Sequence, residues 1–239
     1  SPAINVRSYL DTTVAYGYGK DWKAVLPGRL SWGVTAKFVN RGYISKTVSA
    51  LDFSADSSLV KSLTFREGYS LDADVGFLYT PLLPGEGFWS LFRLAKPTFS
   101  LVTRNVMESG FNSSFGLLNK NKDGAPPEKM YRVFDVGTKW EYPSVFIFGG
   151  RGVMDIRDIG HPNWNTRKGF HLGFEFDWAV ASWWKGAYRV GLSEGYMTAG
   201  VSALFALFNL DLVTYSEDVG TFDQHKENRM YLIKMNINI

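Results

Sequence analysis

Three histidines, His161, His171 and His225, are the residues of this chain best suited to acid–base or metal chemistry. None has the spacing of a metal motif such as His-Glu-x-x-His, and the chain has no cysteine that could complete a thiolate site. His161 follows Asp155 and Asp158, a combination that a protease could use, but a solvated loop histidine is the simpler interpretation. We therefore predict no catalytic residue, no metal and no cofactor.

His171 lies within a stretch of alternating apolar and polar residues, Phe170–Trp178. Every second residue there is large and apolar, while His171, Glu175 and Asp177 share the other face of the predicted strand. We interpret His171 as part of a polar network; a Ser-His-Asn type of hydrolase is the alternative.

The same period-two alternation recurs along almost the whole chain. All of these stretches except the shorter Phe208–Leu212 are close to the ~9–11 residues that a tilted membrane strand requires, and no apolar run approaches the ~20 residues of a membrane helix. The stretches are Leu30–Phe38, Tyr69–Tyr79, Phe134–Glu141, Phe170–Trp178, Trp184–Leu192, Phe208–Leu212 and Tyr231–Ile239, with less regular ones at Leu10–Tyr18, Pro97–Val106, Phe146–Ile156 and Tyr196–Leu204. This pattern predicts an all-β chain: one antiparallel barrel domain over residues 1–239 with about 10–12 strands. Twelve is favoured if Ala3–Ser8 forms a strand of its own.

A soluble sandwich and a membrane barrel both show this alternation, so the polar face must distinguish them. Here it carries charges of both signs on nearly every strand, which favours an ion-paired lumen over a solvated surface. The predicted luminal side chains are Lys37, Arg104, Lys139, Arg151, Lys185, Arg189 and Lys234, with Asp11, Asp72, Asp74, Asp135, Glu141, Asp155, Glu175, Asp177, Asp211 and Glu217.

Connection lengths and aromatic residues give the orientation. Connections near Pro143-Ser144, Ala179–Trp183 and Phe205–Leu207 are short, whereas those at Gly42–Glu67, Met107–Met130, Gly160–Arg167 and Asp218–Asn228 are long and polar. Short periplasmic turns and longer outer loops are typical of bacterial outer-membrane barrels. An aromatic girdle is predicted beside the short turns; its members are Tyr79, Trp140, Tyr142, Trp178, Trp183 and Trp184.

Several features lie outside this regular wall. Val48–Leu63 is predicted to form a helix in an outer loop or in the lumen, and Gly87–Leu94 an interfacial helix; for both segments an ordinary loop helix is the alternative. Small or polar residues interrupt the lipid-facing positions at Thr103, Asn105, Gly150 and Gly152, which predicts a contact in a homo-oligomer.

An ordered set of segments also resembles a known family. The segments are Lys37–Tyr43 (KFVNRGY), Gly68–Pro81 (GYSLDADVGFLYTP), Lys96–Val106 (KPTFSLVTRNV), Arg189–Gly200 (RVGLSEGYMTAG), Leu210–Gly220 (LDLVTYSEDVG) and Glu227–Tyr231 (ENRMY). They resemble TraF-like and PorV-like outer-membrane proteins, distant relatives of FadL-type hydrophobe transporters; a looser similarity is to ring-forming, lipid-enclosing porin-like proteins. The resemblance implies a barrel with no catalytic residues to carry over. At Ile239 the chain departs from the terminal aromatic usual in such barrels.

These patterns predict an outer-membrane, porin-like barrel with a narrow or closed ion-paired lumen. Its expected partners are membrane lipid, further copies of itself and a small hydrophobic ligand. The net charge of +3 is too small to indicate a nucleic-acid partner. An outer-membrane lipase or protease, or a loop-based adhesion or assembly scaffold, is the alternative.

Overall fold

The computed structural model describes residues 3–22, 27–49, 66–87, 89–113, 126–220 and 224–237. These residues are almost entirely β-structure, in one antiparallel sheet of eleven strands that follow each other in sequence order. The strands are β1 (Ala3–Trp22), β2 (Gly28–Ser49), β3 (Arg66–Pro81), β4 (Thr98–Arg104), β5 (Val133–Val145), β6 (Phe148–Ile159), β7 (Phe170–Ala181), β8 (Trp184–Ser193), β9 (Tyr196–Phe205), β10 (Phe208–Asp218) and β11 (Glu227–Ile237). The predicted all-β class is confirmed.

The sheet is not closed into a barrel: within the described residues nothing pairs with the outer edge of β1 or of β11. The strand count of eleven lies inside the predicted range, but Ala3–Ser8 belongs to β1 instead of forming a separate strand. The prediction that a loop begins at Gly42 was also wrong, because β2 continues to Ser49. The polar residues of this stretch led us to expect a loop, whereas it belongs to β2, the strand between β1 and β3 in the sheet.

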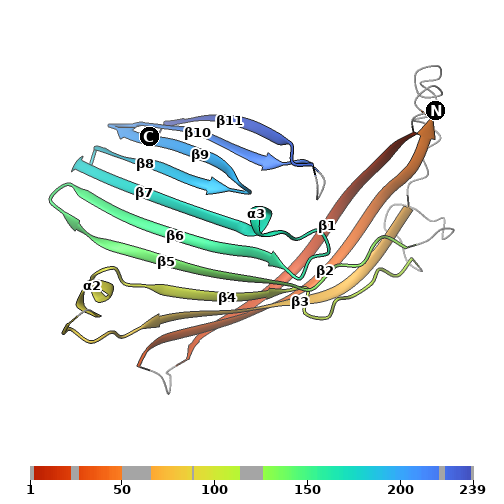
Figure 1. The fold of residues 1–239 in the computed structure, drawn as a ribbon, viewed down its shortest axis with the longest axis horizontal. Helices are drawn as coiled ribbons and strands as arrows, with labels where there is room; N and C mark the ends of the chain where they lie inside the picture. Colours follow the sequence, from red (N-terminus) through yellow and green to blue (C-terminus); the bar gives the residue numbers. More distant parts are fainter. Residues whose placement is uncertain are drawn as a thin grey trace. The chain divides into compact units, whose positions relative to one another are not determined.

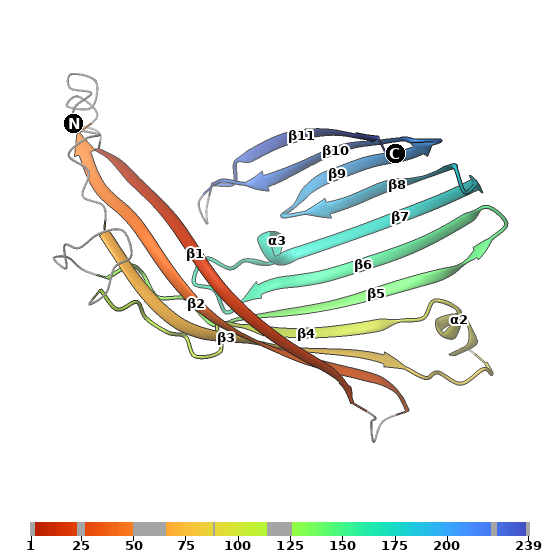
Figure 2. The same ribbon diagram turned by 180° about the vertical axis from the view of Figure 1, so that it is seen from behind.

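The chain divides into two compact units. The first comprises residues 1–18, 34–75 and 104–132, and the second comprises residues 19–33, 76–103 and 133–239. In the second unit β5 to β11 run side by side, with three short turns (β5–β6, β7–β8 and β9–β10) and helix α2 (Trp89–Leu94) at one end. The short β8–β9 turn and α3 (Thr166–Gly169) lie at the other (Figures 1 and 2).

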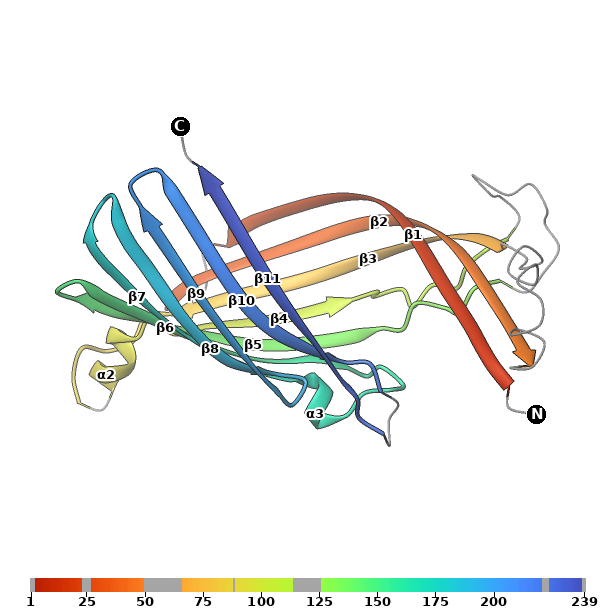
Figure 3. The same ribbon diagram turned by 90° about the horizontal axis from the view of Figure 1, so that it is seen from above.

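The hairpins of the second unit have tight turns whose residues adopt a left-handed backbone. Phe146, Ala206, Glu194 and Gly195 have φ values of 55°, 53°, 53° and 79°, the conformation that two-residue hairpin turns require. The turns joining β7 to β8 and β9 to β10 can be followed in Figure 3. Pro143 and Ser144, predicted to be a turn, are instead strand residues of β5, and the turn lies three residues further along.

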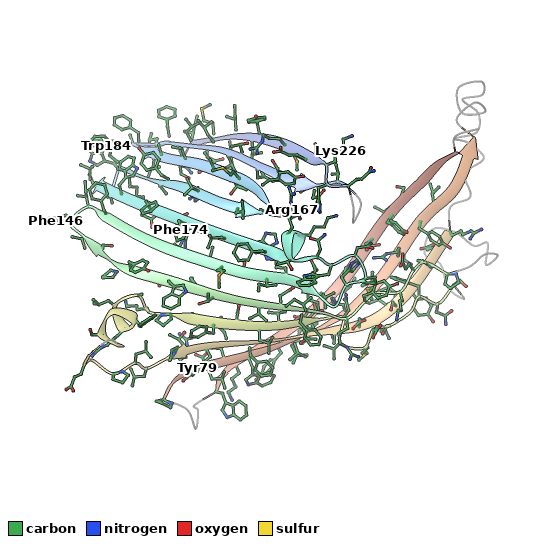
Figure 4. All side chains as sticks on the ribbon, viewed as in Figure 1. Tyr79, Phe146, Arg167, Phe174, Trp184 and Lys226 are labelled. Carbon is green, nitrogen blue, oxygen red and sulfur yellow. The ribbon has the colours of Figure 1, made fainter. Side chains whose placement is uncertain are left out.

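The registers give the sheet two distinct faces. In β7 and β8, Phe174 lies opposite Val190 and Phe176 opposite Tyr188, whereas Glu175 lies opposite Arg189 on the other side. The same division continues through β9, β10 and β11, so the second unit has one apolar and one charged face. Phe174 lies midway along the strands, and Phe146 and Trp184 lie at the short-turn end (Figure 4).

The first unit has a small core of its own. Val39 of β2 packs with Phe111 and Met130, which belong to the connection between β4 and β5, and all three are buried. Residues of the β4–β5 connection therefore cover this part of β2, whereas the apolar side chains of β7 to β11 are exposed.

The helix predicted within Gly87–Leu94 is confirmed as α2, and its Phe92 packs against Trp140 with ring centroids 5.6 Å apart. Val48–Leu63 lies almost wholly outside the described residues; only its first two residues are placed, at the end of β2. None of the described helices has the length and apolar character that crossing a membrane demands.

Candidate functional site

A row of alternating charges crosses four strands on the charged face. Glu141 of β5 lies opposite Arg151 of β6, Arg151 opposite Glu175 of β7, and Glu175 opposite Arg189 of β8. Because side chains directly opposite each other in antiparallel strands share a face, the register alone brings these four together. We call these four residues the charge row.

Glu175 is the centre of the charge row. Its carboxylate is bound by the guanidiniums of Arg151, at 2.6 Å, and of Arg189, and the side chain is only 10% exposed. Asp177 lies two residues further along the same strand, on the same face. A carboxylate shielded to this degree needs such partners, because desolvation of an unpaired charge is costly.

Glycine and serine leave space beside the row. Arg189 lies opposite Gly200, and its second guanidinium nitrogen donates to the hydroxyl of Ser202. A cavity of about 340 Å³ lies over Arg151, Gly173 and Gly191, and another of about 370 Å³ lies beside Asp177 and Lys185. The charged face of the second unit is therefore partly open and lined by both signs of charge.

In the first unit, predicted luminal residues form a second cluster. Lys37 donates to Asp74, at 2.6 Å, and to the side-chain oxygen of Asn105, at 2.8 Å. Asp72 is nearly fully buried and accepts backbone N–H groups of Met107 and Ser109. The structure thus brings Lys37 and Asp74 together, whereas Asp72 binds backbone.

The other predicted luminal residues make more local contacts. Lys139 pairs with Glu141 at 2.7 Å on the same strand, with both side chains nearly half exposed. Asp135 accepts the backbone N–H of Asp158, and Arg104 is half-buried at the end of β4. Asp211 lies opposite Lys234 in the register.

The predicted girdle residues gather on the apolar face at the short-turn end. Trp178 and Trp184 contact edge to face with centroids 5.8 Å apart, and Trp183 stacks on Trp184. Tyr142 lies opposite Gly150 on β6. Tyr79 donates its hydroxyl to the carbonyl of Pro27.

The four residues predicted to form an oligomer contact do not share one surface. Thr103 shares a face with Phe99 and Leu101, but Asn105 has left β4 and, besides accepting from Lys37, donates to the carbonyl of Tyr131. The prediction that Asn105 faces lipid therefore does not match its placement, because the chain turns there through a left-handed residue, φ 54°.

Gly150 and Gly152 lie on the apolar face, yet neighbouring strands crowd both positions. A Cβ atom at Gly152 would lie 3.4 Å from the ring of Phe174, and one at Gly150 would lie 3.3 Å from the carbonyl oxygen of Glu175. The aromatic ring of one strand thus fills the space left by the glycine of the next.

The histidines occupy separate places. His171 Nδ1 lies 3.0 Å from the hydroxyl of Ser193, and Asp155 lies opposite His171 in the register on the other side. Asp155 pairs with Arg157 at 2.7 Å. Within the described residues no group of three or more metal-ligating side chains is arranged to hold an ion.

Sequence reasoning missed Arg41, whose guanidinium makes two bonds to Asp11, at 2.7 and 2.8 Å. The signal was available, because Lys37, Val39, Arg41 and Tyr43 continue the period-two pattern past Phe38. It was masked by interpreting Gly42 as the start of a loop.

Sequence reasoning also missed the buried carboxylate of Asp218, at the loop end of β10. Asp218 accepts the backbone N–H groups of Gly220 and Lys226, pairs with His225 and lies 3.9 Å from Lys168. Burial opposes ionisation, but these groups outweigh it and lower the pKa of Asp218 from 3.8 to about 2. Asp218 ends β10, whereas its partners come from α3 and from the β10–β11 connection, so no local sequence pattern could predict these contacts.

No protein-family model, no curated protein and no solved structure matches this chain. The resemblance to TraF-like and PorV-like proteins therefore stays a prediction.

We predict that Glu175→Gln destabilises the protein, because two guanidiniums lose their shared counter-charge. Breaking a buried pair costs about 3–5 kcal/mol, but Arg151 and Arg189 are nearly half exposed, so about 1–2 kcal/mol is expected. Glu141→Gln is the matched control, since its more exposed pair with Lys139 should contribute less than about 1 kcal/mol. Urea unfolding of both variants measures the difference, and equal losses would contradict a central role for Glu175.

We predict that the anchoring of the β10–β11 connection by Asp218 survives mild acid. A folded-state pKa below the ordinary value contributes stability above about pH 3.8, and this contribution is lost as the pH falls through about 2. The amide resonance of Gly220, followed by NMR in detergent micelles, should stay constant from pH 7 to pH 4. In Asp218→Asn it should be shifted at every pH, and a midpoint near pH 4 in the parent would contradict the assignment.

Proposed function

We propose that the sheet is the wall of a transmembrane β-barrel in a bacterial outer membrane. Its apolar face contacts lipid and its charged face lines a narrow, ion-paired lumen, as in a porin-like protein that conducts little. The observation that carries the proposal is the pairing of a broad exposed apolar face with an opposite face whose charges are matched and partly buried.

The apolar face is too large to be left in water. Its exposed side chains on β7 to β11 include Phe174, Phe176, Trp184, Tyr188, Val190, Met197, Val201, Phe205, Phe208, Leu210, Leu212, Tyr231, Ile233, Met235 and Ile237. Burying each such side chain is worth about 1.5–3 kcal/mol. These side chains are 39–76% exposed, so covering each one would contribute only part of that figure. An exposed apolar face of this extent supports a covering by lipid.

The height of the apolar face suits a bilayer. Along β7 it runs from Phe170 to Trp178, which at ~3.4 Å per residue is about 27 Å. A strand tilt of about 40° reduces this to about 21 Å, close to the ~25 Å band of outer-membrane barrels. Polar residues follow at the loop end of the same face, including Glu194 after β8 and Arg229 on β11. At the opposite end lies the aromatic girdle, as expected at a membrane interface.

Closing the barrel requires a partner for the free edges of β1 and β11. Neighbouring strands are antiparallel throughout, so with eleven strands β1 and β11 run in the same direction. Closure then needs either a parallel pair or one more strand between them. Even strand numbers are usual in single-chain bacterial barrels, which favours an added strand.

Lipid or another hydrophobe has a place on this wall. A groove of about 450 Å³ lies on the apolar face between Tyr188 and Tyr231, with Ala199 and Leu212 between them. Self-association remains part of the proposal, with Thr103 and Gly150 as the predicted contact residues on this face that no aromatic ring is shown to cover. Native mass spectrometry in mild detergent tests both ideas, and a lipid-free monomer would contradict them.

We predict that two neighbouring lysine substitutions on β11 destabilise the protein to very different extents. Ile233 points to the apolar face and Leu232 to the charged face, although both are more than half exposed. In a bilayer Ile233→Lys should cost about 2–4 kcal/mol, whereas Leu232→Lys should cost little because it faces the lumen.

The measurement is urea unfolding of each variant in liposomes. The control is the protein in buffer that contains neither lipid nor detergent. If both variants behave alike in liposomes, or if the protein stays folded and dispersed once detergent is removed, the membrane proposal fails.

A hydrolase is the second candidate, favoured by the hydrogen bond between His171 and Ser193. Ser193 would be the nucleophile and His171 the general base, with Asp155 as the neighbouring acid. The engagement of Asp155 with Arg157 weighs against it. Ester hydrolysis by the purified protein that disappears in Ser193→Ala and persists in Ser202→Ala would establish it. Without such activity, Ser193 is a structural partner of His171.

A further inference from the structure

A lysine shares a cleft with aromatic rings near the short-turn end of β1, within the second unit. The cleft has a volume of about 780 Å³, and its lining residues are Lys20, Asp21, Trp22, Trp32 and Phe77. Lys20 is exposed, and Trp22 and Phe77 are 58% and 42% exposed. We call this hollow the lysine cleft.

The side chain of Lys20 points away from those of its two neighbours in the strand. Asp21 binds the hydroxyl of Ser31 at 2.6 Å, and a Cβ atom at Gly19 would lie 3.8 Å from the Cα atom of Gly33. These contacts place Lys20 across from Trp32, on the opposite side of β1 and β2. The aliphatic stem of the lysine therefore lies on the side of the rings, with its ammonium free to reach polar surroundings.

The lysine cleft belongs to the apolar face of the second unit. The hydroxyls of Thr80 and Thr98 meet at 3.0 Å on the other side of β3 and β4, so Phe77 and Phe99 share a side. The ring of Phe99 contacts that of Trp140, with centroids 6.4 Å apart, and Trp140 lies opposite Gly152 on the apolar face.

Lys20 lacks a counter-charge within the described part of the chain. No carboxylate there pairs with it, and its neighbour Asp21 is bound to Arg29, at 2.8 Å, and to Ser31. A lysine on the lipid side of a barrel is costly at the bilayer midplane and nearly neutral at the interface. Its place near the short-turn end, among tryptophans, corresponds to the interface.

We propose that the lysine cleft binds one anionic phospholipid of the phosphatidylglycerol class, in the leaflet beside the short turns. This inference rests on the proposed function, because the apolar face meets lipid only if the sheet is a membrane barrel. Lys20 binds the phosphate oxygens, and an acyl chain lies along Trp32 and Phe77.

The charges of the lysine cleft favour an anionic headgroup over a zwitterionic one. The ammonium of phosphatidylethanolamine would meet the like charge of Lys20. The one carboxylate that lines the cleft, that of Asp21, is already bound to Arg29 and Ser31. Phosphatidylglycerol carries the phosphate without the added cation.

The test is native mass spectrometry of the full chain in mild detergent, titrated with phosphatidylglycerol or phosphatidylethanolamine of the same acyl chains. The parent should prefer phosphatidylglycerol, and Lys20→Ala should bind it about fivefold more weakly, the effect of one cation at an anionic lipid surface. Lys20→Arg should retain the binding. Lys185→Ala is the matched control, since Lys185 also lies near the short-turn end but on the charged face, beside Asp177.

A fluorescence measurement in liposomes locates the bound lipid. At a low fraction of labelled lipid, brominated phosphatidylglycerol should quench tryptophan fluorescence more than brominated phosphatidylethanolamine does. Replacing the two tryptophans of the lysine cleft, Trp22→Phe with Trp32→Phe, should remove this difference while the other six tryptophans remain.

The outcomes separate the lipid site from the membrane proposal. Equal binding of the two lipids, undiminished binding by Lys20→Ala, or an equal loss in Lys185→Ala would overturn the site and leave the barrel intact. A quenching difference that persists without Trp22 and Trp32 would overturn it as well. A parent protein that binds neither lipid and stays folded and dispersed without detergent would instead overturn the membrane proposal.

Discussion

Adjacent residues in these strands lie on opposite faces of the sheet, one apolar and one charged, and this constraint governs most of the structure. A strand places successive side chains on opposite faces. Shifting its register by one residue would therefore move its charged side chains to the apolar face. The charge row shows how the constraint is met: Glu175 reaches Arg151 and Arg189 only because all three lie in one row of the register. The apolar face needs no such pairing, and the ring of Phe174 covers Gly152.

Strands and faces could be predicted from the sequence because they depend on local spacing. Phe174 and Glu175 were assigned to opposite faces correctly, and the tight turn after β7 brings Glu175 and Arg189 opposite each other. The pairing of Arg151 with Glu175 could not be predicted in this way, since α3 and an irregular loop separate β6 from β7. Two other features escaped for related reasons: Asp218 binds groups distant in sequence, and Asn105 turns away from its strand through a left-handed residue.

Closure of the sheet is a different kind of property. Pairing between neighbouring strands follows from turns and alternation, whereas closure depends on what satisfies the free backbone groups of β1 and β11. Unpaired edges expose N–H and C=O groups and invite pairing with another strand. In a hydrocarbon medium each unsatisfied group costs several kcal/mol, so the membrane proposal and the pairing of these edges stand or fall together.

The first three strands are longer than a bilayer requires, and their loop ends carry buried apolar residues. β1, β2 and β3 have 20, 22 and 16 residues, whereas about 9–11 suffice to cross a bilayer. In the proposed membrane barrel, strands of this length would extend beyond the bilayer. Val39 and Tyr43 occupy charged-face positions of β2, yet Val39 is apolar, Tyr43 is aromatic, and both are buried. Such side chains are stabilised only if another part of the chain covers them, as Phe111 and Met130 cover Val39. The long strands therefore require a small core at their loop ends, and the β4–β5 connection supplies it.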